Sequence, residues 1–339
     1  MISVQGVGSL AEMSLAQLQT SGRNLILLRE AELVAASLED RGISATFLKG
    51  VALLDAMYES LADRRMVDID VLVRAKDLEK AVAVLRESGY AAQPNALVLS
   101  KSAGEILIQV DLHAELWLFH SEDFWRRRER KSKESRMKVL CPVDQFLHIA
   151  WHSVVQDGHV SVQALSDCHA ILESNGSRFS WDRLAAIAVE EGWEKPVTLF
   201  LEQMEATYPG IIPAEVLDVL SRRKFSRQVG ARGRVPSNLD STGRAAGCSY
   251  PRRSMSRPFD SGSLRWQNPY VRMLKLQSQW RKRIRLILKL ALPSPGFLRM
   301  RYSRFPRSLS FLLTIFRPIL LSCEFVAGQA MRCRPGRYR

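Results

Sequence analysis

The stretch MVDIDVLV, residues 66–73, decides the fold because β-branched and acidic side chains alternate along it. Successive side chains of a β-strand point to opposite faces, so the valines and isoleucine at odd positions share one face, and Asp68 and Asp70 the other. Two like charges side by side are unfavourable unless a cation neutralises them, and Mg²⁺ prefers carboxylate oxygens. The pattern predicts a strand with a metal site, although a D-x-D pair alone is also typical of a solvated strand edge.

A second stretch, ILIQVDLH at residues 106–113, alternates in the same way. Its apolar residues occupy the even positions, so Gln109, Asp111 and His113 lie on the opposite face. If the two strands are neighbours, Asp111 converges with the aspartates of the first. A cluster of that kind can hold two metal ions.

The stretch TFLKG, residues 46–50, precedes both, and there a predicted strand runs directly into a helix. Gly50 permits close backbone approach, and the first N–H groups of the helix form an anion site to which Lys49 adds a point charge. Arg64 and Arg65, just before the first aspartate, are further candidates for phosphate contact. Each signal alone is common, and their order along the chain is the specific part.

Periodicity places these motifs in an α+β unit. We expect helices at 14–41, 50–58 and 77–88, closed by Gly42 in the first case and Gly89 in the last, and strands at 43–48, 66–73, 97–100 and 106–112. Residues 144–220 are predicted to be all helical, with breaks at Gly158, 174–176, Gly192 and 209–210, and Ser180 caps one helix. Helical periodicity returns at 271–292 and at 311–326.

Charge divides the 339 residues unevenly. Residues 1–220 carry a net charge of −10 and residues 221–339 one of +24, which predicts an acidic folded body with a basic tail. A composition bias of the genome is the alternative. Five cysteines without C-x-x-C spacing exclude a zinc ribbon and a disulfide framework, and no targeting or membrane-spanning segment is evident. We expect a cytoplasmic protein.

Together the motifs resemble an uncharacterised bacterial nucleotidyltransferase family of the DNA polymerase β-like superfamily. The resemblance lies in LKGVALLDAMY, RRMVDIDVLV, LRESGY and VDLHAEL and covers most of the chain except residues 221–265. The matching residues are Lys49, Gly50, Arg64, Asp68, Asp70, Gly89, Tyr90, Asp111 and His113. One departure is that the usual glycine-serine pair of the superfamily is replaced by Lys49-Gly50.

The resemblance implies a small mixed sheet of five or fewer strands flanked by helices, followed by a helical domain and a basic helical tail. The implied divisions are an N-terminal helical segment at 1–42, the nucleotidyltransferase core at 43–140, the helical domain at 141–220, a flexible Arg/Ser-rich linker at 221–265 and the basic region at 266–339.

The resemblance also implies transfer of a nucleoside monophosphate from a nucleoside triphosphate (NTP) to an acceptor hydroxyl, with release of pyrophosphate. Asp68, Asp70 and Asp111 would bind two Mg²⁺ ions, for which Mn²⁺ can substitute, and Asp111 would help to deprotonate the acceptor. Lys49 and the Gly50 amide would hold the triphosphate. Arg64 would stabilise its charge or position the loop, and His113 would contact the acceptor or support Asp111.

Three interpretations of the function remain open. Related families are associated with surface polysaccharide production, which favours a sugar or sugar-phosphate acceptor. A protein-nucleotidylylating enzyme of toxin–antitoxin type is the alternative within enzymes. A non-catalytic nucleotide-binding scaffold, or a catalytically inactive relative with ordinary sheet carboxylates, is the alternative outside them.

Two further features have a structural and a functional interpretation. His148 and His152 lie one helical turn apart, and with His159, Asp167 and His169 they resemble metal ligands, but histidines that satisfy a core hydrogen bond are commoner. Residues 271–290 form a basic amphipathic segment, which either contacts an anionic membrane or polyanion or docks on the helical domain.

Overall fold

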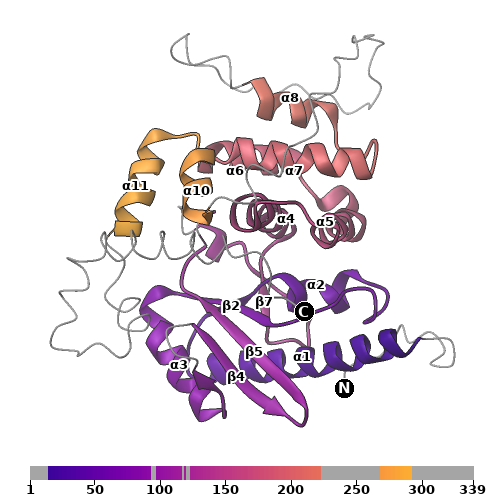
Figure 1. Ribbon diagram of the computed structural model, residues 1–339, viewed down its shortest axis with the longest axis vertical. Helices are drawn as coiled ribbons and strands as arrows, with labels where there is room; N and C mark the ends of the chain where they lie inside the picture. Colours follow the sequence, from indigo (N-terminus) through magenta and orange to yellow (C-terminus); the bar gives the residue numbers. More distant parts are fainter. Residues whose placement is uncertain (1–13, 93–96, 117, 120–122, 223–267, 292–339) are drawn as a thin grey trace, which may run out of the picture.

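The computed structural model describes residues 14–92, 97–116, 118–119, 123–222 and 268–291 (Figure 1). Nearly all of the predicted linker at 221–265 and the predicted helix at 311–326 lie outside these residues. The described part is an α+β fold with a mixed β-sheet, as predicted. In Figure 1 the sheet and its helices occupy one half of the molecule, and a stack of helices occupies the other.

Within the described residues the sheet has seven strands, in the order β3-β4-β5-β2-β1-β7-β6. The strands are β1 (Ala45–Phe47), β2 (Ile69–Val73), β3 (Ala91–Ala92), β4 (Val98–Ala103), β5 (Ile106–His113), β6 (Glu129–Arg130) and β7 (Lys138–Val139). The expectation of five or fewer strands was wrong, because three strands of only two residues extend the two edges. β2 is central and pairs antiparallel with β1 and parallel with β5.

Strand β2 starts at Ile69, three residues later than its alternating pattern predicts. Val67 is 55 % exposed and does not belong to the apolar face. The cause is helix α1 (Leu15–Asp40), since Arg23 donates hydrogen bonds to the carbonyls of Met66 and Val67, and the amide of Met66 donates to Asn24. These backbone groups are therefore bonded to α1 and not to a neighbouring strand.

Helices α1, α2 (Lys49–Met57) and α3 (Leu78–Glu87) contact strands of the sheet. The long helix predicted at 14–41 is confirmed, and a reciprocal hydrogen-bond pair between Ser14 and Gln17 caps its start. Helices α1 and α3 pack against each other and share one apolar core with the sheet. Gly42 and Gly89 end these two helices with positive φ angles of 69° and 88°.

The predicted helical region consists of α4 (Pro142–Trp151), α5 (Val162–Asn175), α6 (Trp181–Glu191), α7 (Glu194–Thr207) and α8 (Ala214–Arg222). Helix α4 continues as a π-helical turn, η4 (His152–Asp157), until Gly158. The predicted breaks at Gly158 and Gly192 are confirmed, and the hydroxyl of Ser180 accepts the amide of Arg183 at the start of α6. These helices share a second apolar core, to which Leu72 of β2 also contributes.

The basic segment predicted as one helix at 271–292 forms two, α10 (Pro269–Leu276) and α11 (Trp280–Ala291). The helix breaks because the buried side chain of Gln277 donates to the carbonyl of Glu191, and the amide of Ser278 donates to Gly192. Met273 and Leu276 are buried in the core of the helical region. The segment therefore docks on the helices, which was one of its two interpretations. Among the described helices, none combines the length and apolarity needed to cross a membrane.

Candidate active site

The turn between β1 and α2 places Lys49 over the sheet. Lys49 has a φ of 49°, a left-handed conformation that favours glycine. Its ammonium donates a hydrogen bond of 3.0 Å to Oδ1 of Asp70. Although burial alone would lower the pKa of Lys49, the charge of Asp70 and the hydrogen bond to it raise the pKa above its usual value. Lys49 therefore stays cationic beside the acidic cluster.

Gly50 is the point at which this turn meets the segment before β2. A Cβ atom built on Gly50 would lie 2.6 Å from a guanidinium nitrogen of Arg64 and 2.9 Å from Cγ of Met66. No side chain fits there without displacing one of these residues. Glycine at this position thus reflects close packing against Arg64 and Met66, whereas the sequence analysis connected Gly50 with phosphate binding.

Parallel pairing of β2 and β5 brings the carboxylates together. Asp70 and Asp111 are direct register partners, and His113 lies two residues further along β5 on the same face. Nε2 of His113 lies 2.9 Å from Oδ1 of Asp70 and 3.7 Å from Oδ2 of Asp111. One potential ligand atom from each of these three residues lies within 4.8 Å of the others. The strand pattern predicted convergence of the aspartates on the condition that the two strands are neighbours; they are, and Asp70 and Asp111 lie together.

Asp68 precedes β2 and is half-buried. It does not belong to the compact trio of ligand atoms formed by Asp70, Asp111 and His113, but its charge interacts with those of Asp70 and Asp111. The structure thus places all three predicted carboxylates in one electrostatic environment, with Asp70 at its buried centre.

The three carboxylates differ in how their charge is supported. Burial would raise the pKa of Asp70, but the hydrogen bond from His113 and the charge of Lys49 hold it well below its usual range. Burial, with the nearby charge of Asp70, raises the pKa of Asp68. Burial also raises that of Asp111, and the charge of Asp70 adds to it although His113 opposes it. Partly desolvated carboxylates that repel one another fit a divalent cation, whose charge would relieve the repulsion.

Arg64 forms a buried ion pair with a residue that the sequence analysis did not connect to it. Its Nε and a terminal nitrogen donate to both carboxylate oxygens of Asp167 on α5, at 2.7 and 2.8 Å. The hydroxyl of Tyr58 donates to the same carboxylate at 2.5 Å. The side chain of Arg64 is 6 % exposed. The guanidinium is therefore bound to the helical region, 103 residues away in sequence.

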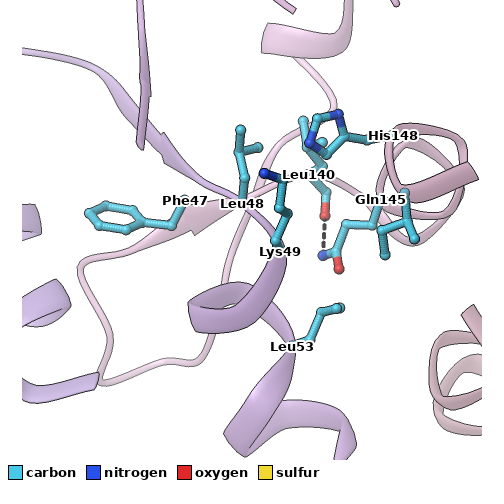
Figure 2. Close-up of a pocket in the computed structure, with 8 residues that line it drawn as sticks. Phe47, Leu48, Lys49, Leu53, Leu140, Gln145 and His148 are labelled. Atoms are coloured by element: carbon cyan, nitrogen blue, oxygen red, sulfur yellow. Dashed lines mark hydrogen bonds between the residues drawn. The ribbon is translucent and has the colours of Figure 1, made fainter. Parts of the chain in front are cut away.

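His148 on α4 faces the same region. Neither of its ring nitrogens has a hydrogen-bond partner among the described residues, so the expected core hydrogen bond is absent at this histidine. It lines a small pocket together with Lys49 and Gln145 (Figure 2). Burial and the charges of His152 and Lys49 keep its pKa well below the usual range, so the ring is neutral. His148 differs from an ordinary core histidine because it lines this pocket. No pattern in the sequence reveals the pocket.

The remaining members of the predicted histidine group have partners elsewhere. His152 contacts Asp157 at 3.2 Å, and His169 contacts Glu173 at the same distance. Asp167 is bound to Arg64. The group thus divides among separate local contacts.

Comparison with protein families shows what the chain is similar to. The model of a family described as an uncharacterised nucleotidyltransferase matches residues 6–209, a span that includes the strands β1 to β7 and helices α1 to α7. No curated protein matches the chain.

Proposed function

Since the chain belongs to this family of uncharacterised nucleotidyltransferases, we propose that it transfers a nucleoside monophosphate from an NTP to an acceptor hydroxyl and releases pyrophosphate. The observation that carries the proposal is the register pairing of Asp70 with Asp111 beside the ammonium of Lys49. This arrangement offers carboxylates for metal ions and a cation for phosphate in one place.

Asp68, Asp70 and Asp111 are the residues that would hold two divalent ions, Mg²⁺ or Mn²⁺ in its place. Their carboxylate oxygens are the ligands that Mg²⁺ prefers. Bound ions of this kind supply positive charge that activates the attacking oxygen and neutralises the triphosphate. Asp70 is already ionised by its contacts with Lys49 and His113, so it is ready to bind a cation.

Lys49 and the backbone amide of Gly50 would bind the triphosphate at the start of α2, where free amide groups and the helix dipole favour anions. The acceptor oxygen bonds to the α-phosphorus while the bond from that phosphorus to the bridging oxygen breaks and pyrophosphate leaves. Asp111, beside the bound ions, would help to take the proton of the acceptor hydroxyl. His113 positions Asp70 by its hydrogen bond and lies within reach of Asp111.

Arg64 acts by positioning in this proposal, the second of the roles expected for it. Its guanidinium is bound to Asp167 and lies against Gly50, so it holds the turn that carries Lys49. A sugar or sugar phosphate remains our proposed acceptor, because related families are associated with polysaccharide production.

Calorimetry tests the proposal. A non-hydrolysable analogue of each NTP, with Mg²⁺, is titrated into the wild type, the Asp68→Ala/Asp70→Ala double variant and Asp182→Ala, which removes an exposed carboxylate on α6. We expect Mg²⁺-dependent binding of at least one analogue in the wild type and in Asp182→Ala, and its loss in the double variant. Equal binding by all three proteins would contradict the metal site, and binding without turnover on any acceptor would favour a nucleotide-binding scaffold.

One surface supports the proposed contact of the tail with an anionic membrane. Helix α11 exposes Trp280, Ile284 and Ile287, which are 60, 47 and 47 % exposed, beside basic residues on the same helix. Such a face suits peripheral contact with anionic lipid. We expect the double variant Ile284→Ser/Ile287→Ser to sediment less than the wild type with phosphatidylserine vesicles. Equal sedimentation of the two proteins would exclude contact through α11.

A further inference from the structure

Unpartnered polar atoms concentrate on one helix. Of the five buried side-chain nitrogen and oxygen atoms without a hydrogen-bond partner in the described residues, four belong to α4. They are Oε1 of Gln145, both ring nitrogens of His148 and Nε1 of Trp151. Buried polar groups in folded proteins nearly always have a partner, so such a concentration requires an explanation.

Gln145 and His148 line a single pocket, and its third polar wall is Lys49 (Figure 2). The two α4 residues are three positions apart, on one side of the helix, and are only 6 and 5 % exposed. Apolar side chains make up the remainder, and the space suits a group of about the size of a water molecule. The pocket thus adjoins the turn that would hold the triphosphate.

The free atoms define what kind of group fits. The side-chain amide nitrogen of Gln145 already donates to the carbonyl of Leu140 at 2.6 Å, so its oxygen is left as an acceptor. A neutral imidazole offers one donor and one acceptor. Phosphate oxygens only accept, so they cannot donate to the oxygen of Gln145, whereas a hydroxyl group can donate to that oxygen and accept from the imidazole N–H.

From this geometry we propose that Gln145 and His148 bind a hydroxyl group of a substrate and thereby extend the active site onto the helical region. The inference deepens the proposed function and rests on it. Two sources carry the same chemistry: the ribose of the nucleotide and the hydroxyls of a sugar-like acceptor.

His148→Leu separates a binding role from a structural one. A histidine that held the core together would leave a less stable protein when replaced. Here leucine removes two unpartnered nitrogens from the interior, so we expect an unchanged or raised Tm together with weaker ligand binding. His169→Leu is the matched control, because His169 lies on α5, stacks on Tyr208 and has no part in the pocket.

The ribose arm uses the NTP analogue that the calorimetry above identifies, with its 2′-deoxy and 3′-deoxy forms. If the ribose is the source, we expect one deoxy form to bind the wild type and His169→Leu about tenfold more weakly than the ribonucleotide. His148→Leu should bind the ribonucleotide and that deoxy form equally. Equal binding of all forms by the wild type excludes the ribose.

The acceptor arm adds glucose, galactose, myo-inositol and glycerol to the nucleotide-loaded protein and follows the imidazole signals of His148 by NMR, assigned by their loss in His148→Leu. A shift at His148 with any of these probes, and none at His169, would support an acceptor hydroxyl. Failure of both arms would overturn the proposal and leave the pocket as a site for a fixed water molecule.

The experiments distinguish failure of this inference from failure of the metal site. In one outcome, His148→Leu no longer distinguishes the ribonucleotide from its deoxy form, while Asp68→Ala/Asp70→Ala still binds the NTP analogue in a Mg²⁺-dependent way. That outcome would retain the hydroxyl site and reject the metal site. The reverse pattern would retain the metal site and reject the role of His148.

Discussion

Gly50 shows how tightly the site is built at the level of single residues. The guanidinium of Arg64 and the thioether of Met66 occupy the space that any side chain at this position would need. Three parts of the structure therefore come together at the α-carbon of Gly50. They are the turn that carries Lys49, the segment before β2, and the Arg64 guanidinium that is paired with α5. A change at Gly50 disturbs all three.

Gly50→Ala tests this packing. Its Cβ would lie 2.6 Å from the guanidinium of Arg64, so we expect a loss of about 1–3 kcal/mol in the free energy of unfolding. Gly22→Ala is the control, because no atom lies within 4 Å of the added carbon and the residue is inside α1. That variant should gain about 0.5–1 kcal/mol, since alanine is the better helix former. Chemical denaturation measures both, and similar effects of the two variants would contradict the close packing.

Asp167 provides a second test at this scale. Replacement by alanine leaves the 6 % exposed guanidinium of Arg64 without its carboxylate, which should cost about 3–5 kcal/mol of stability. The control is Glu87→Ala, which breaks the pair between Arg41 and Glu87, both more than half exposed. An exposed pair contributes at most about 1 kcal/mol. Equal losses in thermal or urea unfolding would show that the buried pair is not the link between the turn and α5.

At the scale of elements, the pairing of β2 with β5 concentrates negative charge at the edge where β1 ends. Asp68 and Asp111 have raised pKa values because they are partly buried beside Asp70. In the absence of a cation, ionising these two groups therefore works against folding, and their protonation at lower pH relieves the repulsion. A bound divalent ion would do the same at neutral pH.

This leads to a pH-dependent effect of Mg²⁺ on stability. We expect Mg²⁺ at ten times its Kd to raise the free energy of unfolding by about 1.4 kcal/mol at pH 7.5. The gain should shrink as the pH is lowered from 7.5, because the raised pKa values of Asp68 and Asp111 let protons compete with Mg²⁺ for these carboxylates. Differential scanning calorimetry with and without Mg²⁺ measures it. A gain that persists in Asp68→Ala/Asp70→Ala would place the ion elsewhere.

At the scale of the whole molecule, a segment from the basic end of the chain completes the helical half. Arg272 on α10 is 2 % exposed and donates to the carbonyls of Val155 and Gln156 in the π-helical turn. The ammonium of Lys282 binds Glu191, and that of Lys289 binds Glu115. The opposite charges predicted for the front and back of the chain thus meet in part inside the molecule.

Arg272→Ala should therefore destabilise the protein even though it lies in the basic region. A buried and a partly buried carbonyl lose a charged donor, and we expect a loss of about 2–4 kcal/mol in the free energy of unfolding, together with faster proteolysis. Arg285→Ala, on the exposed face of α11, should change stability by less than about 0.5 kcal/mol. If both variants unfold at the wild-type temperature, the docking of α10 contributes nothing to stability.

Local patterns in the sequence determined the type of most elements. The alternation in residues 106–113 predicted β5 to within one residue, and the glycines at 42, 89, 158 and 192 marked helix ends correctly. The same alternation predicted that Asp111 lies opposite the apolar face of its strand, and that it meets the aspartates of residues 66–73 if the two strands are neighbours. Such features follow from the sequence because they depend on the geometry of a few consecutive residues.

The tertiary structure decided what the side chains contact. Arg64 meets Asp167 across 103 residues, α1 delays the start of β2, and Gln277 divides the basic helix by bonding to Glu191. It also placed His148, which was expected to make a core hydrogen bond, in the lining of the pocket beside Lys49, where its ring nitrogens have no hydrogen-bond partner among the described residues. No local pattern contains these contacts, because each depends on how separate elements pack once the apolar cores have formed.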